Sequence, residues 1–309
     1  MSLKTPVYEA VEVGEEFGPI ELLVDDHAIK SFAFAMDDYN PWYFGGATPF
    51  GCRVAPPALV AKHLLVVFLS KYDPNLVVGL HQKEEIWCHR PVPCGSRLTL
   101  SGKYVNKYVK RGKGYVVLEA EARDEHGRVL VRQRSTEVMR IPEGIKVGAR
   151  SAEPPARQVQ GVWPADRKPV AMASRDVVQG TPLPPMVKQV HQDQMSAFSG
   201  ADWHWHNIHT DIRIAQGAGF GKCITQGMME ACWLSEMMGS FFGPSWYTTG
   251  WLSTVFLSPV FAGDTLTFKA VVTDLKEEAE GLKVELEVWC ENQKGVMTAG
   301  GWASAIVGQ

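Results

Sequence analysis

Residues 219–229, with the sequence GFGKCITQGMM, decide the fold that we expect for this chain. They open a run from Met228 to Phe242 that is apolar almost throughout, and a helix that is hydrophobic on all sides is a buried one. A similar stretch, FGCRV at residues 50–54, precedes a second apolar run from Ala58 to Leu69. The same pattern in both halves indicates two copies of one structural unit.

Further pairs of segments keep the same order in the two halves. Residues 11–19 correspond to residues 176–184, and residues 90–98 correspond to residues 258–266, which lie 168 positions later. Alternating strand patterns follow each apolar run, at 97–105, 114–122 and 129–134 in the first half and at 266–273, 282–290 and 296–307 in the second. One buried helix with an antiparallel sheet able to wrap it is an α+β arrangement.

The length of the chain agrees with two such units. A chain of 309 residues fits two domains of about 150 residues each. The stretch from 141 to 185 contains eight prolines and reads as a connection between the halves. We therefore expect a first unit at 1–145, a linker at 146–175 and a second unit at 176–309.

The composition excludes some classes of partner. With 45% hydrophobic and 21% charged residues the chain resembles an ordinary globular protein, and its net charge of -3 gives no field that attracts nucleic acid. The basic run from Lys107 to Lys113 is the exception. It predicts a solvated hairpin turn, with contact to an anion such as a nucleotide phosphate as the alternative.

The cysteines and the start of the chain bear on the compartment. The six cysteines are scattered, with no C-x-x-C and no zinc-type spacing. The first residues, MSLKTP, form no apolar signal segment, and no run approaches the roughly 18 apolar residues of a membrane span. We expect a reduced, cytoplasmic protein.

Residues 200–211, GADWHWHNIHTD, hold three of the nine histidines within six positions, beside two carboxylates and two tryptophans. Imidazole is the side chain best suited to exchange protons near neutral pH. A proton-transfer loop followed by a glycine at a helix start is a plausible arrangement for processing a polarised carbonyl. Thr210 and Asp211 are suited to cap a short helix that begins at Ile212.

A metal site is the rival interpretation of this cluster. His204, His206 and His209 have spacings that suit a divalent ion, and Asp211 or His191 would add a ligand. However, no glutamate follows His209 before position 230, and the glycine-rich, helix-opening flank does not suit a jelly roll. We therefore favour a site without metal.

These segments resemble the MaoC-like dehydratase and R-specific enoyl-CoA hydratase family, which has the hotdog fold and the signature S-G-D-x-N-P-x-H. The resemblance implies a tandem, or double, hotdog over the whole chain, each unit being an antiparallel sheet wrapped around a buried helix. The run H-x-I-H-x-D at 206–211 is similar to that of mesaconyl-CoA hydratase-type relatives.

The resemblance implies a site in the second half. The aspartate and histidine of the signature are the family's acid/base pair, and His209 fits that histidine. Five positions before it stands His204, and the nearest upstream aspartate is Asp202. The partner of His209 thus stays open among Asp202, His204 and His206. The family holds the thioester oxygen with a backbone N–H at the start of the buried helix, which implies a substrate site at Gly227 with Gln226, Met228 and Asn207.

The first half departs from the signature. It carries D-x-N-P at 38–41, but Tyr43 takes the place of the histidine, and a phenol with a pKa near 10 is a poor base. The stretch equivalent to the helix start, residues 55–58, contains Pro56 and Pro57, which have no N–H to donate. We expect a degenerate site here, in a unit that shapes the acyl tunnel and completes the sheet.

The implied activity is that of a hydro-lyase of fatty acid metabolism, which hydrates a trans-2-enoyl-CoA thioester or dehydrates the (R)-3-hydroxyacyl form. No cofactor is expected beyond the CoA of the acyl-CoA substrate, and a homodimer is the expected assembly. The alternatives are an acyl-CoA thioesterase and a non-catalytic acyl-CoA-binding module.

Overall fold

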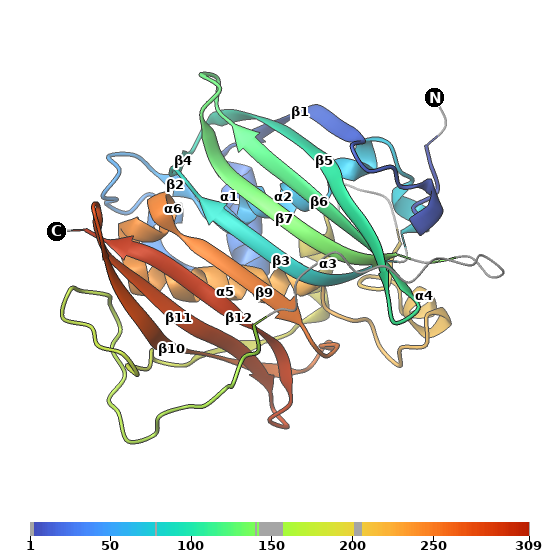
Figure 1. The fold of residues 1–309 in the computed structure, drawn as a ribbon. Helices are drawn as coiled ribbons and strands as arrows, with labels where there is room; N and C mark the ends of the chain where they lie inside the picture. Colours follow the sequence, from blue (N-terminus) through green and yellow to red (C-terminus); the bar gives the residue numbers. More distant parts are fainter. Residues whose placement is uncertain (1–2, 78, 140, 142–156, 201–205, 309) are drawn as a thin grey trace.

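A single antiparallel sheet of ten strands runs through the described part of the chain (Figure 1). The structure is a computed structural model that describes residues 3–77, 79–139, 141, 157–200 and 206–308. The strand order is β1–β5–β6–β7–β3–β9–β12–β11–β10–β8. The strands are β1 (Glu16–Val24), β3 (Leu80–Cys88), β5 (Ser96–Lys110), β6 (Lys113–Arg123), β7 (Val129–Met139), β8 (Met186–Gln189), β9 (Trp251–Phe256), β10 (Thr265–Glu278), β11 (Gly281–Asn292) and β12 (Met297–Val307).

The strand order is symmetric about its centre, and this confirms the predicted repeat. Strands β1, β5, β6, β7 and β3 of the first half correspond in sequence order to β8, β10, β11, β12 and β9 of the second. The two halves meet where β3 pairs with β9, with Ile86 opposite Leu252. Because the pairing is continuous across this junction, both halves share one sheet.

Helices α2 (Pro57–Leu65) and α5 (Gly227–Phe242) lie on the same face of the sheet and contact each other (Figure 1). Most residues of α5 are buried, as expected for a helix that is apolar on all sides. Helices α1 (Asp26–Met36) and α3 (Gln192–Ser199) also pack together. The two central helices place their N-termini at corresponding points of the two halves.

The remaining elements are short. They are η1 (Tyr8–Ala10), η2 (Pro41–Tyr43), β2 (Val54–Ala55), η3 (Val67–Ser70), η4 (Pro74–Leu76), β4 (Val92–Pro93), α4 (Ile212–Gly217), η5 (Gly243–Ser245) and α6 (Trp246–Thr249). No helix among the described residues is both long and apolar enough to cross a membrane.

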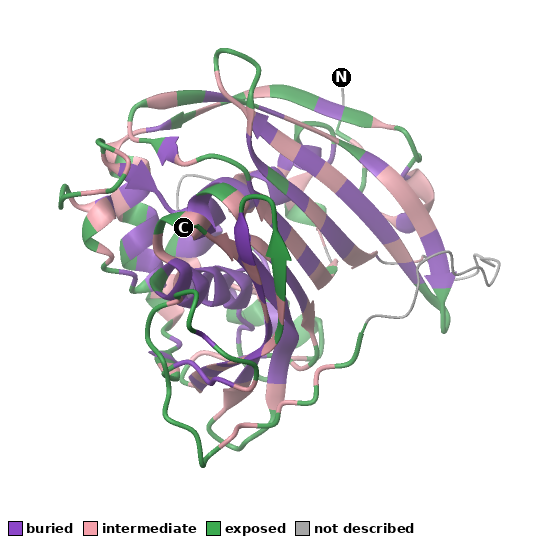
Figure 2. Ribbon diagram, turned by 60° about the vertical axis from the view of Figure 1, so that its left-hand side comes forward, coloured by how far each residue is buried: buried purple, intermediate pink, exposed green. Residues whose placement is uncertain are grey.

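Burial alternates along the strands, as a sheet with one covered face requires (Figure 2). The six predicted strands are confirmed, and all but the last extend beyond their expected bounds. The basic run forms the β5–β6 hairpin, as expected, and Arg111 and Gly112 at its turn both have positive φ, at 52° and 72°. Such a turn follows the right-handed twist of the paired strands.

The first apolar run differs from its expected extent. The α-helix ends at Leu65, and a separate 3₁₀ turn, η3, covers Val67 to Ser70. Within the predicted linker, the described residues lie against the second half: the backbone N–H groups of Gln160 and Gly161 donate to Oε1 of Glu287. The domain boundaries stay a prediction.

Candidate active site

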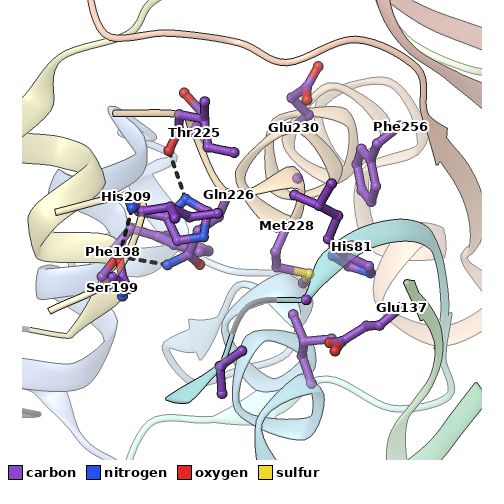
Figure 3. A pocket seen from close by; sticks show the side chains of 18 of the residues that line it. His81, Glu137, Phe198, Ser199, His209, Thr225, Gln226, Met228, Glu230 and Phe256 are labelled. Atoms are coloured by element: carbon purple, nitrogen blue, oxygen red, sulfur yellow. Dashed lines mark hydrogen bonds between the residues drawn. The ribbon is translucent and has the colours of Figure 1, made fainter. Parts of the chain in front are cut away.

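A cavity of about 340 Å³ lies between the two halves. The first half contributes residues from α2, η3 and β3 to its wall, and the second half contributes the end of α3, the loop before α5 and the start of α5. Figure 3 shows His209, Gln226 and Ser199 gathered on one side of this cavity. The predicted residues His209, Asn207, Gln226, Gly227 and Met228 all line it.

The orientation of His209 is fixed by three hydrogen bonds. Its ring Nδ1 lies 2.7 Å from the carbonyl oxygen of Ile224, its backbone N–H donates to Oδ1 of Asn207 at 2.8 Å, and its carbonyl accepts from Gln192. A carbonyl only accepts, so Nδ1 carries the proton and Nε2 keeps a free lone pair. Such a ring is arranged to act as a base.

The protein around His209 favours the neutral ring. Burial lowers the pKa of His209 to about 4, and the hydrogen bond to Ile224 opposes this only in part. The ring is therefore unprotonated at neutral pH, which is the form that takes up a proton.

The start of α5 offers a hydrogen-bond donor in the same cavity. Gln226 is the N-cap, and its Nε2 donates to Oγ of Ser199 at 2.7 Å, which joins the end of α3 to the start of α5. No hydrogen-bond acceptor for the Gly227 N–H is found among the described residues. Free N–H groups and the helix dipole favour negative charge at this point.

Glycine is required at position 227 by close packing. A Cβ atom there would lie 2.9 Å from the ring of Phe256. Real Cβ contacts are longer, so a side chain would displace either the helix start or the ring. Met228 is fully buried beside it, and the Nδ2 of the buried Asn207 has no hydrogen-bond partner in the described part of the chain.

Of the other predicted acids, only His206 falls among the described residues. Asp202 and His204 lie outside the described residues. His206 is exposed, is absent from the cavity wall, and places Nδ1 3.4 Å from Oδ2 of Asp211. As predicted, Asp211 caps α4 by accepting from the Arg213 N–H, and the side chain of Arg213 holds the pKa of Asp211 at about 2.

No group of three or more histidine, cysteine, aspartate or glutamate side chains that could hold a metal ion occurs among the described residues. His204, one member of the rival metal set, is not among them.

Two family models match the chain once each. Residues 168–293 match the MaoC-like domain, and residues 11–133 match the FAS1-like dehydratase domain region. The second half is thus similar to the MaoC-like domain. The first half is thus related to dehydratases through a different family model.

Solved structures agree with this double architecture. A MaoC-like dehydratase superposes with a TM-score of 0.76 at 18% identity, covering 98% of this chain and 100% of that one. A Mycobacterium tuberculosis protein described as a double hotdog gives 0.67 at 14%, covering 97% and 98%. A Lactobacillus plantarum protein assigned as an oleoyl thioesterase gives 0.55 at 11%, covering 96% and 98%. At these identities the likeness shows the fold alone, which is the predicted double hotdog. No curated protein sequence matches the chain.

The first half lacks both features of the second-half site, the histidine and the free backbone N–H at the start of the buried helix. Helix α2 begins at Pro57 with Pro56 as its N-cap, so its first positions have no N–H to donate. The hydroxyl of Tyr43 is buried and lies 2.8 Å from that of Tyr247. A side chain from the second half thus contacts Tyr43, the residue that stands in place of the motif histidine.

The structure adds polar residues to the cavity that sequence reasoning missed. His63, His81, Glu137 and Glu230 all line the cavity wall. Burial lowers the pKa of His63 to about 4 and raises that of Glu230 to about 8. The signal available in the sequence was weak: Glu230 is the only charged residue in the first turn of a largely apolar helix that also contains Glu236.

Proposed function

We propose that the protein catalyses the reversible hydration of a trans-2-enoyl-CoA thioester, which is the dehydration of an (R)-3-hydroxyacyl-CoA in the other direction. One observation carries the proposal. The MaoC-like domain presents a neutral, oriented imidazole and a free backbone N–H to the same cavity.

In this mechanism Nε2 of His209 takes a proton from water while the water oxygen bonds to Cβ of the enoyl group. The electron pair of the double bond moves toward the thioester carbonyl, whose oxygen the Gly227 N–H binds. A second acid then delivers a proton to Cα, so that one water is added in total. Asp202 and His204 are the proposed acids, and His206 is the third candidate.

The expected rate contributions of His209 and of the Gly227 N–H are those of a working enzyme. A positioned acid or base contributes roughly 10²–10⁴-fold, and one oxyanion donor about 10²–10³-fold. The Tyr43–Tyr247 pair and the prolines at the start of α2 support the proposal that the first half has a degenerate site and serves to shape the acyl tunnel.

Thioester hydrolysis is the second candidate, because a carboxyl group also lines the cavity. Glu230 lies one turn beyond Gly227 and would direct water at the carbonyl carbon. However, burial raises the pKa of Glu230 to about 8, so at neutral pH most of it is protonated and cannot take a proton from water. The neutral His209 therefore favours hydration.

The experiment is an absorbance assay of the conjugated enoyl thioester on short, branched, dicarboxylic and aromatic enoyl-CoA substrates, with free thiol followed in parallel. Loss of enoyl absorbance without thiol release supports hydration, and thiol release supports the thioesterase. Tight binding without either signal would identify an acyl-CoA-binding module. The proposal includes a cytoplasmic homodimer, as the sequence predicts, and light scattering measures its mass.

A further inference from the structure

The wall of the cavity opposite His209 carries two polar side chains on a largely apolar surface. Much of the first-half contribution is apolar, formed by Leu65, Val66, Phe68, Leu69 and Val77. His81 and Glu137 interrupt this apolar surface. Figure 3 shows both on the side of the cavity away from His209, with Met228 between the two sides.

The sheet register brings these two side chains together. His81 on β3 and Glu137 on β7 are direct partners in the antiparallel pair, so their side chains leave the same face of the sheet. A bulge lies between His81 and Lys83. Because one extra residue reverses the alternation of faces, the bulge also turns His81 toward the same face as Glu84.

The second half holds this bulge in place. Nε2 of Gln82 donates to the carbonyl oxygen of Phe256 at 2.9 Å, and the ring of Phe256 lies 4.8 Å from that of His81. Phe256 also packs against Gly227. The polar wall and the helix start are therefore connected through one aromatic ring.

The hydrogen bonds of His81 fix its tautomer. Nε2 lies 3.0 Å from the carbonyl oxygen of Lys83 and 3.1 Å from Oε2 of Glu84, and both of these accept. Glu84 is fully buried and also accepts from Gln133. Nε2 is thus the protonated nitrogen. Nδ1 has no hydrogen-bond partner in the described structure, although the side chain is nine-tenths buried.

Glu137 is likewise without a hydrogen bond among the described residues, and burial raises its pKa. A carboxyl group in this state donates when protonated and accepts when ionised. Leaving the buried Nδ1 of His81 without a partner is unfavourable, so the site favours a ligand that pairs with it.

We propose that the wall formed by His81 and Glu137 selects an acyl group that carries a hydroxyl substituent beyond the reacting carbons. This inference rests on the proposed function, because it names the substrate class of that site. A hydroxyl donates to Nδ1 of His81 and accepts from, or donates to, the carboxyl of Glu137. A plain alkyl chain leaves both unpaired.

Hydrogen bonding and charge separate the hydroxyl from other polar substituents. Nδ1 of His81 only accepts in this tautomer, so a substituent carboxylate, which also only accepts, finds no donor there. An ammonium would need Glu84 and Glu137 ionised, whereas burial raises the pKa of each, that of Glu84 to about 7. A neutral hydroxyl needs no ionisation of either group.

The test uses enoyl-CoA substrates in matched sets over a series of chain lengths, each with a terminal methyl, hydroxyl, carboxylate or amine. At the chain length that reaches the wall, we expect the hydroxyl substrate to exceed the methyl substrate in kcat/KM by about 10- to 100-fold. Equal values at every length, or a preference for the carboxylate or the amine, would overturn the inference.

Substitutions locate the preference in the wall. Glu137→Met and His81→Phe should remove the advantage of the hydroxyl and improve the methyl substrate, while Glu137→Gln, which still forms hydrogen bonds, should retain most of it. The matched control is Glu85→Met on β3, the strand of His81, because Glu85 pairs with Lys83 and does not line the cavity. An unchanged preference in a folded Glu137→Met protein would contradict the assignment.

Failure of the inference is distinguishable from failure of the proposed function. Calorimetric binding of the same substrates to the His209→Ala protein measures selection without turnover. Turnover without hydroxyl preference overturns only the inference. Hydroxyl-selective binding by a wild-type protein that hydrates nothing overturns only the proposed function.

Discussion

Nδ1 of His209 donates a hydrogen bond to the carbonyl oxygen of Ile224 at 2.7 Å. Ile224 lies two residues before Gln226, which caps the buried helix α5. The proposed base and the proposed oxyanion donor are therefore held by one short turn. Any displacement of the turn moves both groups together, which explains why a single loop conformation can orient the whole site.

His209→Ala removes the proposed base and should lower kcat by about 10²–10⁴-fold. The ring lies at the cavity wall, so the substitution should leave a folded protein. Steady-state kinetics and a thermal melt measure the two effects. Asp211→Asn serves as the control, because Asp211 caps α4 without lining the cavity. Comparable turnover by the His209→Ala protein would exclude its role as base.

The pH profile follows from the lowered pKa of His209. With a pKa of about 4 the base form persists to low pH, so kcat/KM should fall only as pH drops through about 4, well below the ordinary histidine value of 6.5. Stability has the same sign. Because the unfolded chain takes up the proton first, stability falls as pH drops from 6.5 toward 4. An activity midpoint near 6.5 that is lost in His209→Ala would contradict the buried, neutral ring.

A pair of double variants isolates the Gly227 N–H. Phe256→Ala makes room for a Cβ at position 227, so Gly227→Ala and Gly227→Pro can be compared in that background. Proline is tolerated at the first helical position, as Pro57 shows in the first half, but it has no N–H. The proline protein should be slower than the alanine protein by about 10²–10³-fold. Equal kcat values would mean that another group binds the oxygen.

Tyr43→Phe tests the degenerate site. It leaves the Tyr247 hydroxyl buried without its partner, which should lower the free energy of unfolding by about 1–3 kcal/mol. Because this pair does not line the cavity, kcat should change less than about threefold. Adding Tyr247→Phe should restore part of the stability, as denaturant unfolding would show. A large loss of kcat without loss of stability would show that the first half takes part in catalysis.

The sequence predicts β5, β6 and β7 in the first half and β10, β11 and β12 in the second, but neither the joining strands β3 and β9 nor the edge strands β1 and β8. The predicted strands alternate apolar and polar residues, and the structure confirms them. Strand β3 reads LHQKEEIWC, with its charged residues concentrated in the middle, and β9 has only six residues. Buried charges and a bulge hide the alternation of β3, because Glu84 faces the interior in place of an apolar residue.

The site also contains residues that the sequence predicts and residues that it does not. His209 and Gly227 carry local signals, since one stands in a family motif and the other opens an apolar helix. The pairing of His81 with Glu137 has no local signal, because it joins positions far apart in the chain through strand register. A bulge that shifts the alternation by one residue makes such a pair impossible to assign before the register is known.

The most direct test of the central claim is the product of a trans-2-enoyl-CoA incubated with the wild-type protein and with His209→Ala, analysed by chiral chromatography with free thiol measured in parallel. If His209 takes the proton from the attacking water, the wild-type protein should form the (R)-3-hydroxyacyl-CoA with its CoA still attached, and the His209→Ala protein should not. Release of free CoA while the double bond of the acyl group stays intact, or an equal amount of hydrated product from the variant, would contradict hydration by His209.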